Sequence, residues 1–118
     1  MVLADTSVWV GHFRSGDPRL EELLADGLVV CHPFIVGELA CGNLKNRQEI
    51  ISLLQSLPMA VMAEHEEVLQ FINDYRLMGR GLGYIDMHLL ASALLTRVTL
   101  WTRDKKLHAV SLKYGINY

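Results

Sequence analysis

Four acidic residues are found where the chain offers them few polar neighbours: Asp5, Glu38, Asp86 and Asp104. Each one lies in an apolar or small-residue setting, near the expected end of a helix or strand. An ionised carboxylate among apolar groups is costly unless it is paired, hydrogen-bonded or bound to a metal ion. A single shared site would explain all four.

Gathered in one place, such carboxylates repel one another, by ~4 kcal/mol for a pair about 4 Å apart at an effective dielectric constant of about 20. A divalent cation would offset this repulsion. The five histidines show no paired ligand spacing, and oxygen-only ligands favour Mg²⁺ or Mn²⁺ over zinc. Such a centre activates water and neutralises phosphate charge, which suits in-line hydrolysis of a phosphodiester.

Three of the four acids also have a purely structural interpretation. Asp86 and Asp104 could cap helices, a role that contributes ~1 kcal/mol each, and Asp5 could cap a helix or close a turn. Glu38 is harder to explain in this way, because a glutamate inside a helix, between apolar and small neighbours, has no capping role.

The elements that must position these acids alternate between strands and helices. Strands are expected at residues 2–5, 28–31, 98–101 and, more briefly, 115–118. Helices are expected at residues 8–14, 18–26, 33–43, 48–57, 64–78, 84–96 and 105–113. Thr6 or Ser7 is expected to cap the first helix, and Asp17 the second, with Pro18 at its first position. This alternation predicts an α/β domain with a mostly parallel sheet.

The same topology predicts where the acids meet. In open α/β sheets, functional sites form beyond the carboxyl ends of the strands, and Asp5 and Asp104 follow two of the strands. Asp86 begins the helix that runs back to the strand before Asp104, so it starts at the same edge. Glu38, about one turn after Pro33, has a similar geometry available to it.

Basic residues give this interpretation further support, although the net charge of −2 provides no overall basic field. Seven of the eleven basic side chains lie near three of the acids in the sequence, which suits a polyanionic substrate. These are Lys45, Arg47, Arg76, Arg80, Arg103, Lys105 and Lys106.

Composition predicts one compact domain over residues 1–118, with 51% hydrophobic and 20% charged residues. Cys31 and Cys41 lack metal-binding spacing and are expected to be reduced, buried thiols. The N-terminus has no basic leader of the kind found in signal peptides. The longest charge-free stretch, residues 50–63, contains Pro58 and is too short to span a bilayer. We therefore expect a cytoplasmic protein without a membrane segment.

Taken together and in order, these motifs resemble those of PIN-domain ribonucleases, and most closely the VapC toxins of VapBC toxin–antitoxin pairs. The resemblance extends over essentially the whole chain. Its motifs are VLADTS at residues 2–7, VGEL at 36–39, YIDMHLLASA at 84–93 and LWTRD at 100–104.

The resemblance implies a three-layer domain, in which helices flank a central, mostly parallel sheet. It also implies an endoribonuclease that depends on Mg²⁺ or Mn²⁺ and acts as a toxin. Its partners would be the RNA substrate, a VapB-like antitoxin and a second copy of the chain in a homodimer. Many family members carry a further acid after the last aspartate, whereas Lys105 and Lys106 occupy that neighbourhood here.

The resemblance also implies roles for individual residues. Asp5 and Asp86 would bind the metal directly. Glu38 would serve as a ligand or base, and Asp104 would act through water. Thr6 and Thr102 match hydroxyl positions that would orient the carboxylates or metal-bound water.

Two other functions remain open from the sequence. One is a catalytically silent PIN-like module that binds RNA or protein. The other is a phospho-accepting receiver domain, which usually needs paired acids after its first strand, whereas Asp5 is followed by Thr6 and Ser7.

Overall fold

Three parallel strands form the centre of the molecule, in the spatial order β2–β1–β3. The computed structural model describes all 118 residues. The strands are β1 (Val2–Ala4), β2 (Val29–Val30) and β3 (Thr99–Trp101). Because they run in the same direction, their carboxyl ends lie at one edge of the sheet, as the sequence predicts.

The register between β1 and β3 places the two chain segments that follow these strands side by side. Ala4 pairs with Trp101 at the end of the ladder, and the Asp5 N–H donates to the Trp101 carbonyl at 3.0 Å. The residue after each strand, Asp5 or Thr102, therefore emerges at the same point of the sheet edge.

One further residue pair extends the sheet on each side. Cys31 pairs with Met59 beside β2, and Leu100 pairs with Asn117 beside β3. The short strand predicted at residues 115–118 is thus reduced to a single bridge, since only Leu100 of β3 bonds with that segment.

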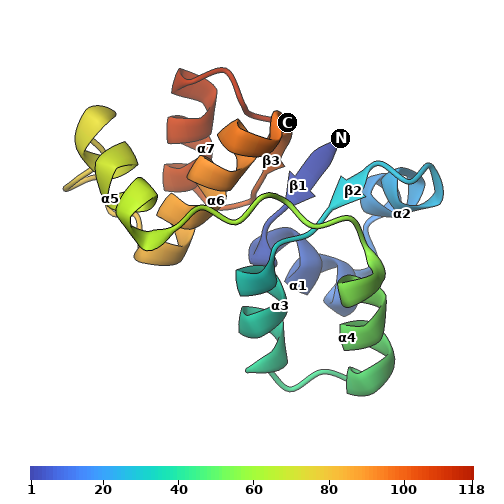
Figure 1. Ribbon diagram of the computed structural model, residues 1–118. Helices are drawn as coiled ribbons and strands as arrows, with labels where there is room; N and C mark the ends of the chain where they lie inside the picture. The colour runs from blue at the N-terminus through green and yellow to red at the C-terminus, as the bar shows by residue number, and fades with distance from the viewer.

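Seven helices surround the strands, in the order that the sequence predicts. In Figure 1, α5, α6 and α7 gather on one side of the strands, and α1, α3 and α4 on another. The helices are α1 (Thr6–Ser15), α2 (Pro18–Ala25), α3 (Pro33–Ala40), α4 (Arg47–Ser56), α5 (His65–Asp74), α6 (Tyr84–Thr96) and α7 (Lys105–Lys113).

Helices α1 and α5 differ from the prediction. Helix α1 begins earlier than expected, and its cap is Asp5 rather than Thr6 or Ser7. This confirms the capping interpretation of Asp5, whose carboxylate accepts the Val8 N–H at 3.3 Å. Helix α5 ends at Asp74 rather than at residue 78, because Arg76 adopts the left-handed conformation (φ 51°). The Leu77 N–H then turns back to the Ile72 carbonyl, which closes the helix.

A single cluster of 25 buried apolar residues forms the core. Residues 87–93 of α6 are all buried, which confirms the interior position predicted for this helix. Trp9 is fully buried and stacks on Phe13, with 5.7 Å between ring centroids. Both cysteines are free, but Cys41 is exposed, contrary to the prediction, because it lies just past the end of α3. No helix combines the length and hydrophobicity that a membrane crossing requires.

His32 is buried completely and caps α3. Its Nδ1 accepts the Phe34 N–H at 2.9 Å, so the neutral ring carries its proton on Nε2, 3.0 Å from the Ser92 hydroxyl. Burial, with a smaller contribution from the charge of His88, lowers the pKa of His32 from 6.5 to about 4.

We predict that His32 makes the protein sensitive to acid. Between about pH 6.5 and 4 the unfolded chain binds a proton that folded His32 does not, so the free energy of unfolding falls as the pH falls. The His32 contribution lost between pH 7 and 4.5 is roughly 2–3 kcal/mol. Urea titrations at both pH values measure this loss. His32→Asn keeps a side-chain oxygen that can cap α3 but does not titrate. Its free energy of unfolding should therefore fall by roughly 2–3 kcal/mol less than that of the parent between pH 7 and 4.5. Equal losses in parent and variant contradict the account.

Candidate active site

Asp5 stands immediately after β1 and is held by three donors. Its Oδ1 accepts the Ser7 hydroxyl at 2.5 Å and the Val8 N–H at 3.3 Å, and its Oδ2 accepts the Thr102 hydroxyl at 2.5 Å. Only 6% of Asp5 is exposed. The three hydrogen bonds fix the direction of this buried carboxylate and satisfy its oxygens.

The two hydroxyls that hold Asp5 also tie β1 to the turn after β3. Thr102 Oγ1 accepts the Asp104 N–H at 3.0 Å, and Ser7 Oγ accepts the Arg103 N–H at 2.9 Å. A hydroxyl has one proton to donate, and both protons go to Asp5. The position of Asp5 therefore depends on a network that joins the ends of both strands.

Glu38 lies on the exposed face of α3, where the buried neighbours Ile35 and Leu39 fix the orientation of the helix. The Thr6 hydroxyl donates to Glu38 Oε1 at 2.7 Å. Thr6 is the first residue of α1, directly after Asp5, so this bond links the Glu38 carboxylate to the chain at the sheet edge. The second carboxylate oxygen of Glu38, Oε2, has no hydrogen bond within the protein.

Asp86 experiences the charges of the other three acids. It lies in the first turn of α6, half-buried, and accepts the Gly83 N–H at 3.1 Å. Burial raises the pKa of Asp86, the Gly83 bond lowers it, and the charges of Asp104, Asp5 and Glu38 each raise it; the net direction is upward. The fold therefore brings Asp5, Glu38 and Asp104 within electrostatic reach of Asp86.

Asp104 has a structural role as well as a place in this acidic group. It caps α7, and its Oδ1 accepts the Leu107 N–H at 2.9 Å. The capping interpretation is therefore correct for Asp104, while its charge still acts on Asp86. Asp86 is not itself the cap of α6, a position taken by Gly83.

The carboxylate oxygens suit a hard divalent cation held partly through water. No three acidic, histidine or cysteine side chains are arranged as a ready set of metal ligands. Mg²⁺, however, usually keeps several waters and takes only one or two carboxylates. Asp5 Oδ2 has a second lone pair free, and Asp86 Oδ1 accepts no hydrogen bond. A cation here would also relieve the repulsion that raises the pKa of Asp86.

Two residues near the site have partners that the sequence does not predict, Ser7 and Arg103. Ser7 was considered only as a helix cap, yet it holds Asp5; the run Asp5-Thr6-Ser7 after a strand was the available signal. Arg103 was expected beside the substrate, but its guanidinium pairs with the buried carboxylate of Asp17. That ion pair anchors the turn after β3 to the start of α2.

We predict that Asp86→Asn stabilises the metal-free protein. The amide oxygen can still accept the Gly83 N–H, while the cost of a half-buried charge facing three like charges disappears. The expected gain in the free energy of unfolding is of the order of 1 kcal/mol at low salt, and less at high salt. Denaturant titrations in EDTA measure it. Glu49→Gln, which removes an exposed acid of α4, should give no gain; a loss of stability in Asp86→Asn contradicts the account.

Comparison with known proteins identifies the family of this chain. A family model described as the PIN domain matches residues 2–113. Two curated relatives from Mycobacterium tuberculosis strains, CDC 1551 / Oshkosh and ATCC 25618 / H37Rv, are both named Ribonuclease VapC32. Each is 46% identical over 117 residues, which cover 98% of this chain and 94% of the relative. Ribonuclease VapC1 of Methanocaldococcus jannaschii is 28% identical over 109 residues, covering 89% of this chain and 76% of the relative.

A solved structure shares the fold at much lower sequence identity. The crystal structure of PAE2754 from Pyrobaculum aerophilum superposes with a TM-score of 0.62 at 16% identity, covering 92% of this chain and 77% of that one. The family match over nearly the whole length also excludes the receiver-domain alternative. This chain belongs to the PIN-domain family, and the VapC ribonucleases are among its relatives.

Proposed function

We propose that this protein is a single-domain endoribonuclease that hydrolyses RNA phosphodiester bonds at the acidic edge of its sheet. The observation that supports the proposal most directly is that Asp86, half-buried at the start of α6, is subject to the charges of Asp5, Glu38 and Asp104. The PIN family match and relatives named as ribonucleases at 46% identity support it.

Mg²⁺ or Mn²⁺ is the cofactor that the proposal requires. Asp5 and Asp86 would hold the ion directly, Glu38 would serve as a ligand or as the base, and Asp104 would act through water. When bound, the cation supplies charge neutralisation for the scissile phosphate and a more acidic water. The carboxylate chemistry of the site supports this assignment, because all four candidates offer oxygen donors.

The remaining roles belong to hydroxyl groups that position the carboxylates. Thr102 and Ser7 hold the two oxygens of Asp5, and Thr6 holds one oxygen of Glu38. Fixed carboxylates need not reorganise when charge develops on the phosphate, which is the main source of electrostatic catalysis. Thr6 and Thr102 are therefore positioning residues in this proposal.

The biological role that we propose is that of a toxin restrained by a cognate VapB-like antitoxin, with the protein acting as a homodimer. The VapC relatives support the toxin assignment. Exposed apolar side chains offer surface that a partner would cover: Leu28, Met59, Val61, Met62, Leu69 and Leu95.

We predict that Asp5→Asn abolishes cleavage of single-stranded RNA. The variant keeps one side-chain oxygen for the α1 cap but loses a charge that the site needs, so the initial rate with Mn²⁺ should fall at least about 100-fold. Gel analysis of an end-labelled RNA measures the rate, and thermal melting verifies folding.

Glu49→Gln serves as the matched control, because it removes an exposed acid outside the site, and it should cleave at the parental rate. EDTA should stop the parent. A folded Asp5→Asn protein that cleaves as fast as the parent overturns the catalytic assignment. A parent that binds RNA but never cleaves it points instead to a silent binding module.

A further inference from the structure

Five basic side chains around α7 and the turn after α5 have no acidic partner within ion-pair distance. The two ion pairs in the molecule use other cations, Arg19 and Arg103. The five are all exposed: Arg76, Arg80, Lys105, Lys106 and Lys113. In a chain with a net charge of −2, this is a local concentration of positive charge that the overall count conceals.

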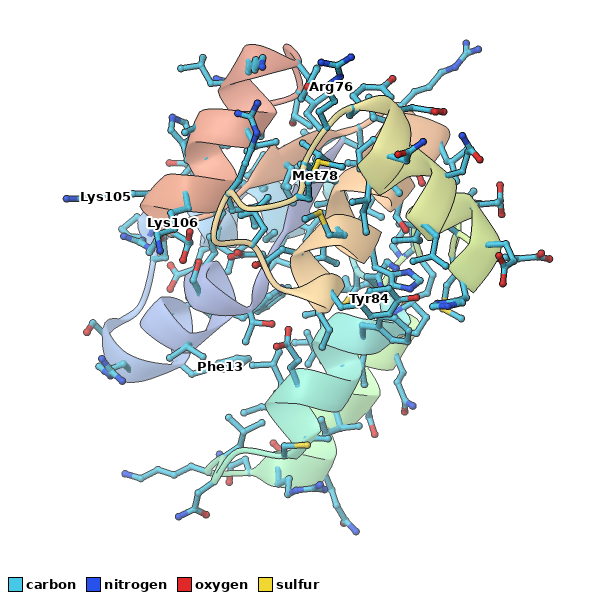
Figure 2. The ribbon with its side chains drawn as sticks, turned by 90° about the vertical axis from the view of Figure 1, so that its left-hand side faces the viewer. Phe13, Arg76, Met78, Tyr84, Lys105 and Lys106 are labelled. Carbon is cyan, nitrogen blue, oxygen red and sulfur yellow. The ribbon has the colours of Figure 1, made fainter.

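The lysines run along α7, starting beside the acidic site. Lys105 and Lys106 directly follow Asp104, the cap of this helix. Lys106 and Lys113 are seven residues apart, so they share one helix face and are separated by about 10.5 Å along its axis. Figure 2 shows Lys105 and Lys106 at one end of α7 and Arg76 toward the other.

A hollow of about 390 Å³ lies at the far end of this row. Here the end of α7 is docked on the end of α5, because the Tyr114 hydroxyl donates to the Tyr75 carbonyl at 3.0 Å and the rings lie 4.9 Å apart. Lys113 Nζ lies 5.6 Å from the centre of the Tyr114 ring. The residues that line the hollow are Asp74, Tyr75, Arg76, Arg80, Lys113 and Tyr114. The carboxylate of Asp74, the one acid among them, accepts a bond from Gln70 at 2.7 Å.

The chain between α5 and α6 links this hollow to the acidic site. Arg76 has a left-handed backbone (φ 51°), a conformation uncommon for residues other than glycine and asparagine. Arg80 Nε donates to the Arg76 carbonyl at 3.2 Å. Further on, Gly81 (φ 77°) lies so close to Lys106 that a Cβ atom would be 2.9 Å from its Cδ and Nζ. The turn therefore rests on the first turn of α7 and continues the row of cations.

We propose that Arg76, Arg80, Lys106 and Lys113 form a basic track that holds the phosphate backbone of the RNA strand as it leaves the acidic site. The inference rests on the proposed ribonuclease function and adds the surface that binds the substrate. Two features favour RNA over an acidic protein segment. The row begins beside Asp104, and the partly exposed ring of Tyr75 lines the hollow between the cations, where a base can pack against it.

The test compares two double variants with equal charge loss. Arg76→Gln/Lys113→Gln removes two cations of the track, whereas Arg14→Gln/Arg97→Gln removes two from α1 and the end of α6. Fluorescence anisotropy with a labelled 12-nucleotide RNA in EDTA gives the Kd over a range of NaCl concentrations. The track variant should raise the Kd roughly tenfold at low salt and reduce the salt slope by about 1.4, or 0.7 for each lost phosphate contact. The control should change neither.

A second assay separates this inference from the proposed function. Hydrolysis of bis-p-nitrophenyl phosphate with Mn²⁺ needs the acidic site, but this substrate is too small to contact the track. The track variant should therefore hydrolyse it at the parental rate. An unchanged Kd and salt slope for RNA overturn the track while leaving the ribonuclease assignment intact. If RNA binding is unchanged but inhibition by the antitoxin weakens, the surface binds protein and the inference is wrong. If the double variant does not fold, Lys113→Gln alone should reduce the slope by about 0.7.

Discussion

A half-buried carboxylate, Asp86, that faces three further acids is the constraint on which the site depends. A parallel sheet brings the residues after β1 and β3 to one edge, and the start of α6 and the exposed face of α3 face the same place. The pKa of Asp86 is raised as a result, by its burial and, to a smaller extent, by the three like charges. A carboxylate whose surroundings disfavour its charged form does not add to the stability of the fold. Groups perturbed in this way cluster at functional sites.

The protein stabilises this acidic group with neutral donors rather than with cations. Ser7, Thr102 and the Val8 N–H hold Asp5, while Thr6 holds Glu38. Neutral donors orient a carboxylate and leave its charge available to a metal ion, whereas an arginine at the same distance would neutralise it. Arg103, which directly precedes Asp104 in the sequence, instead forms an ion pair with Asp17. Unpaired positive charge lies on the surface beside the site, on Lys105 and Lys106, where a polyanion would approach.

The order of the elements and the meeting of the four acids could be predicted from the sequence, because strand–helix alternation and the carboxyl-edge rule are local and topological. Details that depend on packing could not. Helix α5 ends early because Arg76 adopts a left-handed conformation. No glycine or proline at this position indicates that turn in the sequence. The pairing of Arg103 with Asp17 joins residues 86 positions apart. Cys41 looked buried from its neighbours, but α3 stops just before it.

The most direct test of this account is a crystal structure of the protein grown with Mn²⁺, with anomalous scattering used to locate the ion. The account predicts an anomalous peak about 2.0–2.3 Å from carboxylate oxygens of Asp5 and Asp86, with Glu38 or Asp104 reached directly or through water. A well-ordered structure in which Mn²⁺ binds elsewhere, while these four side chains remain metal-free and RNA cleavage still requires the ion, contradicts it.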